Sequence, residues 1–351
     1  MNQEKRIIYA DLLRIFATFS VIVLHVSSTD WYTTSVFDFN WQIYNVYDSL
    51  VRWCVPVFVM LSGMFFLTPK KEIDTKTIFS KYIFRIVLSL IIWGLFYNSS
   101  QLLYRYIFYD KDVSVKDILL MFFKIPIGPA WYHLWYLYML IGLYILTPLY
   151  RVFIKNATEQ QVRYLLILFF LFGLCLPFFK EILLIFDSRL KINFDIPELV
   201  NYSGYFFAGY YFSRYEISKK TKLLIYIGGA LSMIFTIIGT SFVSMQKNSP
   251  IALLYDYLLP TTMLEAYMIF NFFKGLESRI TIKSCLFSKL SGYTFGIYLV
   301  HDFVRLLLKK IGFTPDFINP IFAIPIVSFF VFFLSIFFVH FLKKSKLKYI
   351  I

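Results

Sequence analysis

Apolar runs of about 20 residues recur along this sequence from one end to the other. This repetition limits the fold more than any other feature, because a run of that length lets a helix cross the hydrocarbon core of a membrane. The apolar side chains show no alternation with a period of two, so we expect helices rather than the strands of a membrane barrel. The composition agrees: 59% of the residues are hydrophobic and only 16% are charged.

We therefore predict an all-α, polytopic integral membrane protein with about ten transmembrane helices. The predicted spans are residues 8–28, 43–67, 83–107, 132–150, 163–185, 198–213, 222–244, 252–273, 290–309 and 320–342. The stretch 118–131 can form a re-entrant or interfacial segment before the fourth span. No soluble domain, internal repeat or low-complexity linker is visible, so residues 1–351 are expected to form a single membrane domain.

Lysine and arginine are unevenly distributed between the loops. They are frequent in alternate loops such as TPKKEIDTKTIFSK and RYEISKKTK, and in the tail KKSKLKYII, but sparse in the loops between. By the positive-inside rule, both termini are expected to face the cytoplasm. The formal net charge of +14 then belongs to short loops that meet anionic lipid at one membrane face, and nucleic-acid binding is not expected.

The sequence predicts neither a disulfide framework nor a metal site. Cys54, Cys175 and Cys285 are isolated, with no CxxC motif and no ligand-like partner nearby. No permanently bound cofactor is expected. The first span follows Lys5 and Arg6 but lacks a cleavage site of small residues, so it is expected to stay attached as a helix.

Ionisable residues inside the predicted spans are few, and each is costly to place in hydrocarbon. They include Asp11, Arg14 and His25 in the first span, Asp48 and Arg52 in the second, Glu265 in the eighth, and His301, Asp302 and Arg305 in the ninth. Asp48 and Arg52 are four residues apart, so they can pair on one helix face. Arg14 and His25 share a helix face about 16 Å apart along the axis. Both are expected to face the bundle interior or a water-filled cavity, although a polar network that only locks helices together is the structural alternative.

Arg14 and His25, within DLLRIFATFSVIVLHVS, form an Arg-x10-His pattern that resembles the signature of the acyltransferase family 3 membrane proteins. The stretch VPVFVMLSG at residues 55–63 is similar to the family's P-x-F-x-x-x-S-G stretch. HLWYL, which begins at His133, and SGYTFGIYLVH, which ends at His301, also resemble family stretches. The resemblance covers most of the chain, from residue 6 to beyond residue 301.

This resemblance implies an acyl-CoA-dependent enzyme that modifies sugars and other acceptors beyond the cytoplasmic membrane. The chain departs from the family pattern at the third helix, which begins with a single Lys81 and Arg85 where many members have an arginine pair. Thr294 stands where serine is common. The first departure bears on how the phosphates of the donor would be held. Some members carry a fused hydrolase-like domain; this chain is expected to deliver its product alone or with a separate partner.

The expected reaction moves an acyl group, most simply acetyl from acetyl-CoA, to a hydroxyl of an extracytoplasmic or lipid-linked glycan. His25 is the candidate general base, because the ordinary pKa of histidine, about 6.5, suits removal of a hydroxyl proton. Arg14 is the second candidate catalytic residue, placed to bind an anionic or polar part of the donor, since a guanidinium stays charged and forks onto phosphate. Direct transfer and a covalent acyl-histidine relay both stay open.

Six further residues are candidates for substrate binding: Arg52, Ser62, Arg85, His133, Glu265 and His301. His133 and His301 can line the same cavity as His25. Ser62, together with Gly63, is either a hydroxyl donor with close backbone approach or a packing device. Glu265 is either a proton partner or a structural counter-ion.

Five aromatic residues fall toward the predicted outer face: Trp31, Tyr32, Trp41, Trp131 and Trp135. An interfacial aromatic belt is the default interpretation, and stacking on a sugar ring is the sharper alternative.

Two other classes of function are compatible with the sequence. A transporter or flippase for a cell-envelope or exopolysaccharide precursor would use the same intramembrane charges and short helices. A non-catalytic partner of a polysaccharide synthase would need neither Arg14 nor His25. The lysine, isoleucine and asparagine usage points to a bacterial origin and hence to the bacterial cytoplasmic membrane. The sequence does not determine the acceptor, the acyl chain or whether the chain forms an oligomer.

Overall fold

The computed structural model describes residues 6–69, 73–109, 114–186, 198–277 and 285–345, and every regular element in these ranges is helical. The elements are, in order, α1 (Ile8–Ser27), α2 (Phe39–Ser49), α3 (Cys54–Phe66), α4 (Thr75–Thr77), η1 (Ile78–Ile83), α5 (Phe84–Tyr109), α6 (Val115–Ile127), η2 (Tyr132–Leu134), α7 (Trp135–Asn156), α8 (Glu159–Leu168), η3 (Phe169–Cys175), α9 (Leu176–Phe186), α10 (Glu198–Arg214), α11 (Lys219–Gln246), η4 (Leu253–Tyr255), α12 (Pro260–Gly275), α13 (Cys285–Ser291), α14 (Thr294–Lys310) and α15 (Pro320–Lys344). Parts of the loops and tail that carry the prediction of orientation, residues 70–72, 187–197, 278–284 and 346–351, lie outside the described residues. The cytoplasmic location of both termini therefore stays a prediction.

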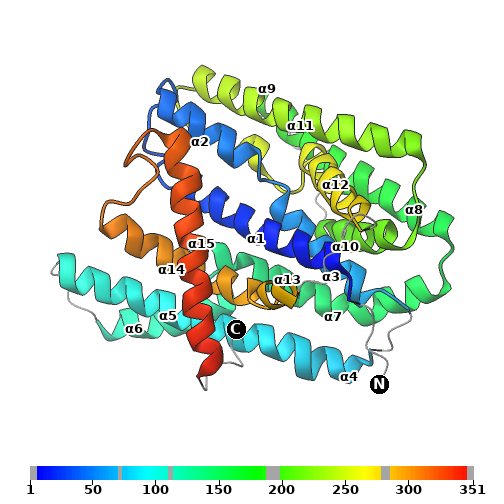
Figure 1. Ribbon diagram of the computed structural model, residues 1–351, viewed down its shortest axis with the longest axis horizontal. Helices are drawn as coiled ribbons and strands as arrows, with labels where there is room; N and C mark the ends of the chain where they lie inside the picture. Colours follow the sequence, from blue (N-terminus) through cyan, green and yellow to red (C-terminus); the bar gives the residue numbers. More distant parts are fainter. Residues whose placement is uncertain (1–5, 70–72, 110–113, 187–197, 278–284, 346–351) are drawn as a thin grey trace.

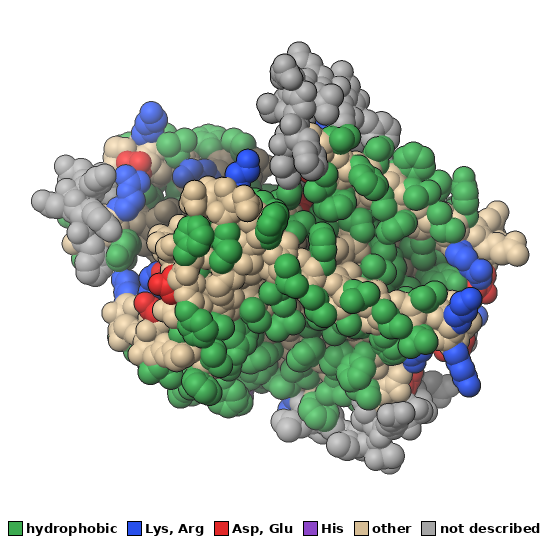
Figure 2. Space-filling view, turned by 90° about the horizontal axis from the view of Figure 1, so that it is seen from above, with side chains coloured by type: hydrophobic (Ala, Val, Ile, Leu, Met, Phe, Trp, Pro, Cys, Tyr) green, Lys and Arg blue, Asp and Glu red, His purple; other side chains and the backbone are tan. Residues whose placement is uncertain are grey.

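The described chain contains 7 helical segments that are long and apolar enough to cross a membrane. They are Ile8–Ser27, Phe39–Phe66, Thr75–Ile107, Val115–Asn156, Glu159–Leu183, Lys219–Gln246 and Pro320–Lys344. Figure 2 shows hydrophobic side chains covering the middle of the visible face, with basic and acidic side chains gathered toward its two ends. An apolar surface of this extent suits lipid rather than water. The prediction of an all-helical, multi-pass membrane protein is thus supported by both the helices and the surface.

The predicted count of ten spans is not confirmed. The predicted spans 198–213, 252–273 and 290–309 correspond to α10, α12 and α14, which have 17, 16 and 17 residues. The predicted start of the eighth span at residue 252 was wrong, since α12 begins only at Pro260, after the short turn η4. Proline suits the first turn of a helix, where its missing N–H leaves no hydrogen bond unmade. The stretch predicted to be re-entrant or interfacial largely forms α6, which packs against α5.

Helix α1 lies in the middle of the bundle (Figure 1) and contacts α2, α3, α12, α13, α14 and α15. Of its most apolar window, 67% is buried inside the protein, against 22% for the segment Glu159–Leu183. A helix enclosed in this way can carry polar side chains without exposing them to lipid. The polar residues of α1 therefore face protein on most sides.

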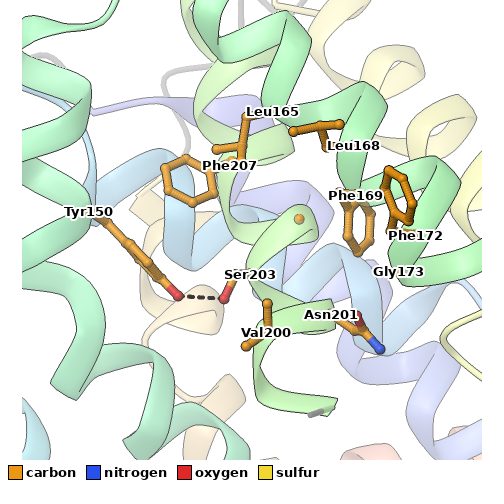
Figure 3. A pocket seen from close by; sticks show the side chains of 11 residues that line it. Tyr150, Leu165, Leu168, Phe169, Phe172, Gly173, Val200, Asn201, Ser203 and Phe207 are labelled. Atoms are coloured by element: carbon orange, nitrogen blue, oxygen red, sulfur yellow. Dashed lines mark hydrogen bonds between the residues drawn. The ribbon is translucent and has the colours of Figure 1, made fainter. Parts of the chain in front are cut away.

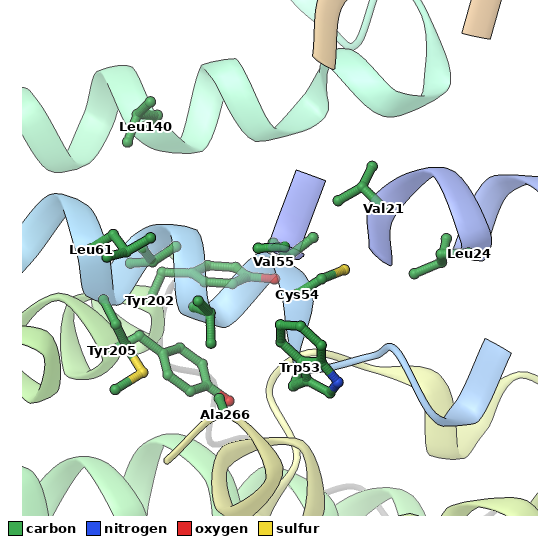
Figure 4. Packing of buried hydrophobic residues seen from close by; sticks show 14 of the residues in the cluster. Val21, Leu24, Trp53, Cys54, Val55, Leu61, Leu140, Tyr202, Tyr205 and Ala266 are labelled. Carbon is green, nitrogen blue, oxygen red and sulfur yellow. The ribbon is translucent and has the colours of Figure 1, made fainter. Parts of the chain in front are cut away.

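Helices α3 and α10 cross with their backbones in contact. A Cβ atom added to Gly63 would lie 1.8 Å from the carbonyl oxygen of Phe206, and one added to Gly209 would lie 1.8 Å from that of Met60. Only glycine fits at such positions. Gly63 is thus a packing residue, one of the two roles that the sequence left open. Figure 4 shows the neighbouring core, where buried side chains of α1, α3 and α10 meet.

The second predicted span, 43–67, is broken between the end of α2 and the start of α3. The belt prediction was wrong for Trp31 and Trp41, which are only 1% and 0% exposed. The Trp41 indole donates a hydrogen bond of 2.9 Å to the carbonyl oxygen of Trp31, and Trp31 packs against Tyr255 at 5.4 Å between ring centroids. These indoles fill the interior between the α1–α2 loop and η4, so they are not available to an interfacial belt.

Candidate active site

One cavity of about 380 Å³ brings together side chains from α1, α3, α5 and α7 and from the segment around α13 and α14. Five of the eight candidate residues from the sequence line it: Arg14, His25, Ser62, Arg85 and His133. A volume of this size is in the range of small-molecule sites, and the walls combine apolar and polar side chains as such sites do. Most of the candidate residues predicted from the sequence therefore lie around a single cavity inside the bundle.

Arg14 and His25 reach this cavity because both lie on the same face of α1. Their separation of about 16 Å along the helix places them toward opposite ends of the space. Helix α1 is the most enclosed of the candidate spans, so protein surrounds both residues on most sides. The predicted shared face is confirmed by the cavity that both residues line.

Three histidines from three elements meet at one end of the cavity. The ring centroids of His25 and His301 are 5.2 Å apart, those of His133 and His301 are 5.0 Å apart, and those of His25 and His133 are 6.3 Å apart. His133 comes from the turn η2 and His301 from α14. His133 lines the cavity as predicted, whereas His301 lies behind the other two rings.

These histidines do not form a metal centre of the usual kind. In the described part of the chain, no group of three or more His, Cys, Asp or Glu side chains is arranged to hold a metal ion. The rings of His25 and His301 are stacked, at 25° between planes, and His133 meets both nearly edge-on. The ring nitrogens of the three histidines are therefore arranged for proton transfer or hydrogen bonding rather than for coordinating one shared metal ion.

The hydrogen bonds of His301 fix where its proton lies. Nδ1 of His301 is 2.6 Å from the carbonyl oxygen of Tyr298, which can only accept, so Nδ1 carries the proton. Nε2 of His301 is buried and finds no partner among the described residues, and the same holds for both ring nitrogens of His133. Buried polar atoms are usually paired, so the ring nitrogens of His133, which lines the cavity, are available for a group that enters it.

Asp302 holds the wall behind the histidines together. It accepts hydrogen bonds from Trp131 Nε1 at 2.6 Å, from the Tyr132 hydroxyl at 2.5 Å and from Arg305 Nε at 2.8 Å. Arg305 also donates to the Thr29 hydroxyl at 3.1 Å, which ties α14 to the end of α1. The side chain of Asp302 is fully buried, so this charge-assisted network fixes the position of the neighbouring His301.

At the other end of the cavity, Arg14 is held by a polar cluster. Its Nη1 donates to the Ser291 hydroxyl at 3.1 Å and lies 3.7 Å from Asp11 Oδ1. Ser291 in turn donates to Asp11 at 2.7 Å. Arg6, which precedes α1, donates to the same carboxylate, and this hydrogen bond raises the pKa of the Arg6 guanidinium. The position of Arg14 is therefore set by contacts between α1 and α13.

Two further cations stand where this end of the cavity reaches the surface. Arg85 is exposed, lines the cavity and lies over the Phe295 ring at 5.2 Å. It is the second residue of α5, which continues from the π-helical turn η1, a kind of helix distortion that is frequent at functional sites. Lys343 donates to the carbonyl oxygen of Gly292, a lining residue, at 2.6 Å. The cavity thus has a cationic end and a histidine end.

The structure does not bring Arg52 or Glu265 to this cavity. Arg52 forms the ion pair with Asp48 that their spacing predicts, and it lies 3.9 Å over the Tyr255 ring. It lines a second cavity instead. Glu265 is fully buried, with the Thr236 hydroxyl 3.5 Å from Oε1, and lines neither cavity. A substrate contact for these two residues stays a prediction.

Sequence reasoning missed the phenolic lining of the cavity. Tyr136, Tyr144, Tyr257 and Tyr298 all line it, and Tyr298 donates to the carbonyl oxygen of His133 at 2.6 Å. The chain contains 27 tyrosines, so no single one stood out. Asp302 and Arg305 were visible as intramembrane charges next to His301, but their joint network depends on Trp131 and Tyr132 from a distant segment.

An apolar cavity of about 280 Å³ lies elsewhere, between α7, α8, η3 and α10 (Figure 3). Apolar side chains such as Leu165, Phe169 and Phe207 line it, and a hydrogen bond of 2.6 Å joins the hydroxyls of Tyr150 and Ser203. The lining residues that the structure describes include no carboxylate, imidazole or cation. The chemistry of the candidate site is therefore not duplicated there.

Comparison with known proteins gives one match. The model of a family described as an acyltransferase domain matches residues 7–340, nearly the whole chain. No curated protein and no solved structure matches the chain.

Proposed function

The chain belongs to the acyltransferase family 3, and from this membership we propose that it transfers an acyl group from acyl-CoA to a hydroxyl of a glycan. The family makes it a membrane acyltransferase that transfers groups other than aminoacyl groups. The donor, the acyl group and the acceptor are parts of our proposal. One observation carries it: a single cavity joins a cluster of histidines to a cluster of cations.

The cationic end suits the donor. Coenzyme A carries phosphates at one end and its thioester at the other, so a cavity that binds it needs positive charge at its mouth and a catalytic group inside. Arg85 and Lys343 lie at the mouth, and Arg14 lies further in, within reach of the pantetheine arm. Guanidinium groups bind phosphate in paired hydrogen bonds. We place this mouth at the cytoplasmic face, following the predicted orientation of the termini.

The histidine end suits the acyl transfer. His25 takes the proton of the acceptor hydroxyl while that oxygen attacks the thioester carbonyl. The carbon–sulfur bond then breaks, and the leaving thiolate takes the proton from the imidazolium of His25, which returns to its starting state. His133, with ring nitrogens that lack partners in the described residues, is positioned to hold the acyl carbonyl or the acceptor. A covalent acyl-histidine relay would use the same groups.

An uncharged acyl group, in the simplest case acetyl, fits this end best. A succinyl group would need a cation beside the histidines to meet its free carboxylate. Arg305 is the cation that belongs to this cluster, and its guanidinium is already paired with Asp302 and bonded to Thr29. We therefore propose acetyl-CoA as the donor. The acceptor hydroxyl would then arrive from the extracytoplasmic side of a bacterial cytoplasmic membrane.

The test is thioester cleavage by the purified chain in lipid nanodiscs, followed as free thiol released from acetyl-CoA. We expect slow turnover by the wild type and a loss of about hundredfold in His25→Ala, the usual scale for removing a general base. His340→Ala is the matched control, because His340 bonds Tyr293 outside the cavity. Arg14→Ala is compared with Arg163→Ala, which removes an exposed arginine on α8.

The opposite outcome is equally clear. If the wild type neither binds nor cleaves acetyl-CoA, the enzyme proposal fails for this donor. Movement of a lipid-linked or soluble saccharide across vesicles containing the chain would then establish the transporter alternative. If His25→Ala and His340→Ala cleave at the wild-type rate, His25 is not the base.

A further inference from the structure

A second cavity, of about 550 Å³, adjoins the candidate active site. Trp135 and Tyr257 line both spaces, and their rings are stacked with centroids 5.6 Å apart and planes at 21°. These two side chains therefore form a shared wall between the second cavity and the space that contains His25. A molecule bound in the second cavity lies next to the reaction site without occupying it.

Five aromatic side chains line this cavity. Besides Trp135 and Tyr257, it contains Tyr202, whose ring lies 5.8 Å from that of Trp135, together with Tyr255 and Phe178. A sugar ring has one face of C–H groups and an edge of hydroxyls. Flat aromatic side chains match the C–H face, because they bury it with little loss of conformational freedom. This lining differs from the aliphatic and phenylalanine lining of the cavity in Figure 3.

Hydrogen-bonding groups accompany the aromatic faces. Asn201 is 5% exposed and offers both donors and an acceptor, while Asp256 and Glu181 are exposed carboxylates that only accept. The hydroxyl groups of a sugar can form hydrogen bonds with each of these three side chains, because a hydroxyl both donates and accepts. A lining of apolar and aromatic side chains with a few polar groups is the usual form of a small-molecule site.

The charges of the lining select against an anionic ligand. Arg52 is the one cation among the described lining residues, and its charge is taken up by Asp48 and by the ring of Tyr255. Asp256 and Glu181 leave the cavity with an excess of negative charge. A phosphate-bearing polymer would meet repulsion there, whereas a neutral sugar would not.

We propose that this second cavity binds an uncharged sugar unit of the acceptor glycan and directs one of its hydroxyls past Trp135 and Tyr257 toward His25. The inference rests on the proposed acyl transfer and adds to it the class of acceptor and the place where it binds. It predicts that donor cleavage and glycan acylation can be separated by changing the second cavity alone.

The experiment fills the second cavity and measures the two half-reactions separately. Ala252 lines this cavity but not the first, so Ala252→Val, Ala252→Leu and Ala252→Trp add bulk in steps. Ala230→Trp, at an exposed site on α11 that lines no cavity described above, is the matched control. Thiol release from acetyl-CoA is measured on purified protein, and base-labile acetyl groups are measured in neutral and phosphate-bearing envelope glycans of the producing cells.

We expect acetyl groups on neutral glycan to fall stepwise with side-chain size, at least tenfold for Ala252→Trp, while thiol release stays within twofold of the wild type. Equal acetylation in all variants would overturn the inference, and so would acetyl groups confined to phosphate-bearing polymer. Parallel loss of both readouts along the series would show that the cavities are not separate. A wild type that neither binds nor cleaves acetyl-CoA would instead refute the proposed function for this donor.

Discussion

The imidazole rings of His25 and His301 are stacked in the interior of the bundle, with centroids 5.2 Å apart. His301 is itself fixed, since its Nδ1 donates to the carbonyl oxygen of Tyr298 and its neighbour Asp302 accepts three side-chain hydrogen bonds. The face of His301 therefore sets the plane in which His25 lies. Catalytic groups supported in this way keep the geometry that a reaction requires.

This relationship predicts a positioning role for His301. His301→Leu should lower kcat for thiol release about tenfold, a change of ~1.4 kcal/mol in the barrier, and leave KM for acetyl-CoA unchanged. His301→Asn should retain more activity, because its amide can still donate to the Tyr298 carbonyl oxygen. A higher KM with an unchanged kcat would place His301 in donor binding instead.

Arg85 is predicted to bind the phosphates of the donor. A charge-assisted hydrogen bond contributes about 1.5–3 kcal/mol, so Arg85→Ala should raise KM for acetyl-CoA by roughly ten- to hundredfold with little change in kcat. Acetyl-pantetheine lacks the phosphates, and with it the variant and the wild type should behave alike. A similar defect with both donors would show that Arg85 acts on another part of the molecule.

The close crossing of α3 and α10 predicts a stability effect at Gly63. Gly63→Ala places a methyl group against the Phe206 carbonyl, so the helices must separate, and we expect a loss of about 1–3 kcal/mol or more. Gly228→Ala is the control, since its Cβ would meet Leu264 at an ordinary 3.5 Å. Unfolding in detergent, followed by circular dichroism, compares the two. Equal midpoints would contradict the crossing as described.

The buried pair of Asp302 and Arg305 predicts an asymmetric response to substitution. Asp302→Asn leaves the Arg305 guanidinium without its counter-ion and should destabilise the protein by roughly 3–5 kcal/mol. The double variant Asp302→Asn, Arg305→Gln removes both charges and should recover part of that loss. Thermal unfolding of the single and double variants measures the difference. A double variant less stable than Asp302→Asn would show that the pair is not the source of the effect.

Features that depend on local helix geometry were predictable from the sequence. The shared helix face of Arg14 and His25 follows from 3.6 residues per turn. The structure agrees with this prediction because α1 is a regular, enclosed helix. The pairing of Asp48 with Arg52 followed from their spacing in the same way. The resemblance to the family, carried by short stretches along the chain, was confirmed by a match over residues 7–340.

Features that depend on contacts between distant segments were not predictable. The Asp302 network includes Trp131 and Tyr132, and no sequence pattern near Asp302 predicts these two partners. Trp31 and Trp41 were assigned to a membrane interface because they fall toward the predicted outer face, yet both are buried, stacked on each other, and Trp31 also packs against Tyr255. Helix α12 starts later than hydropathy suggests because the apolar residues before Pro260 form a turn and an extended wall of the second cavity.

The backbone contact between α3 and α10 also makes one side of the candidate active site more rigid than the other. Carbonyl oxygens of one helix lie at the glycines of the other, so neither helix can slide without breaking the contact, and the two act as one rigid body. Helix α5 meets α14 at two levels: Arg85 lies over the Phe295 ring next to the π-helical turn η1, and further along the Tyr97 hydroxyl donates to the carbonyl oxygen of Leu299. The side of the cavity that carries Ser62 therefore belongs to the rigid pair of helices, and the irregular helix geometry next to the cavity lies on the opposite side, where η1 precedes Arg85.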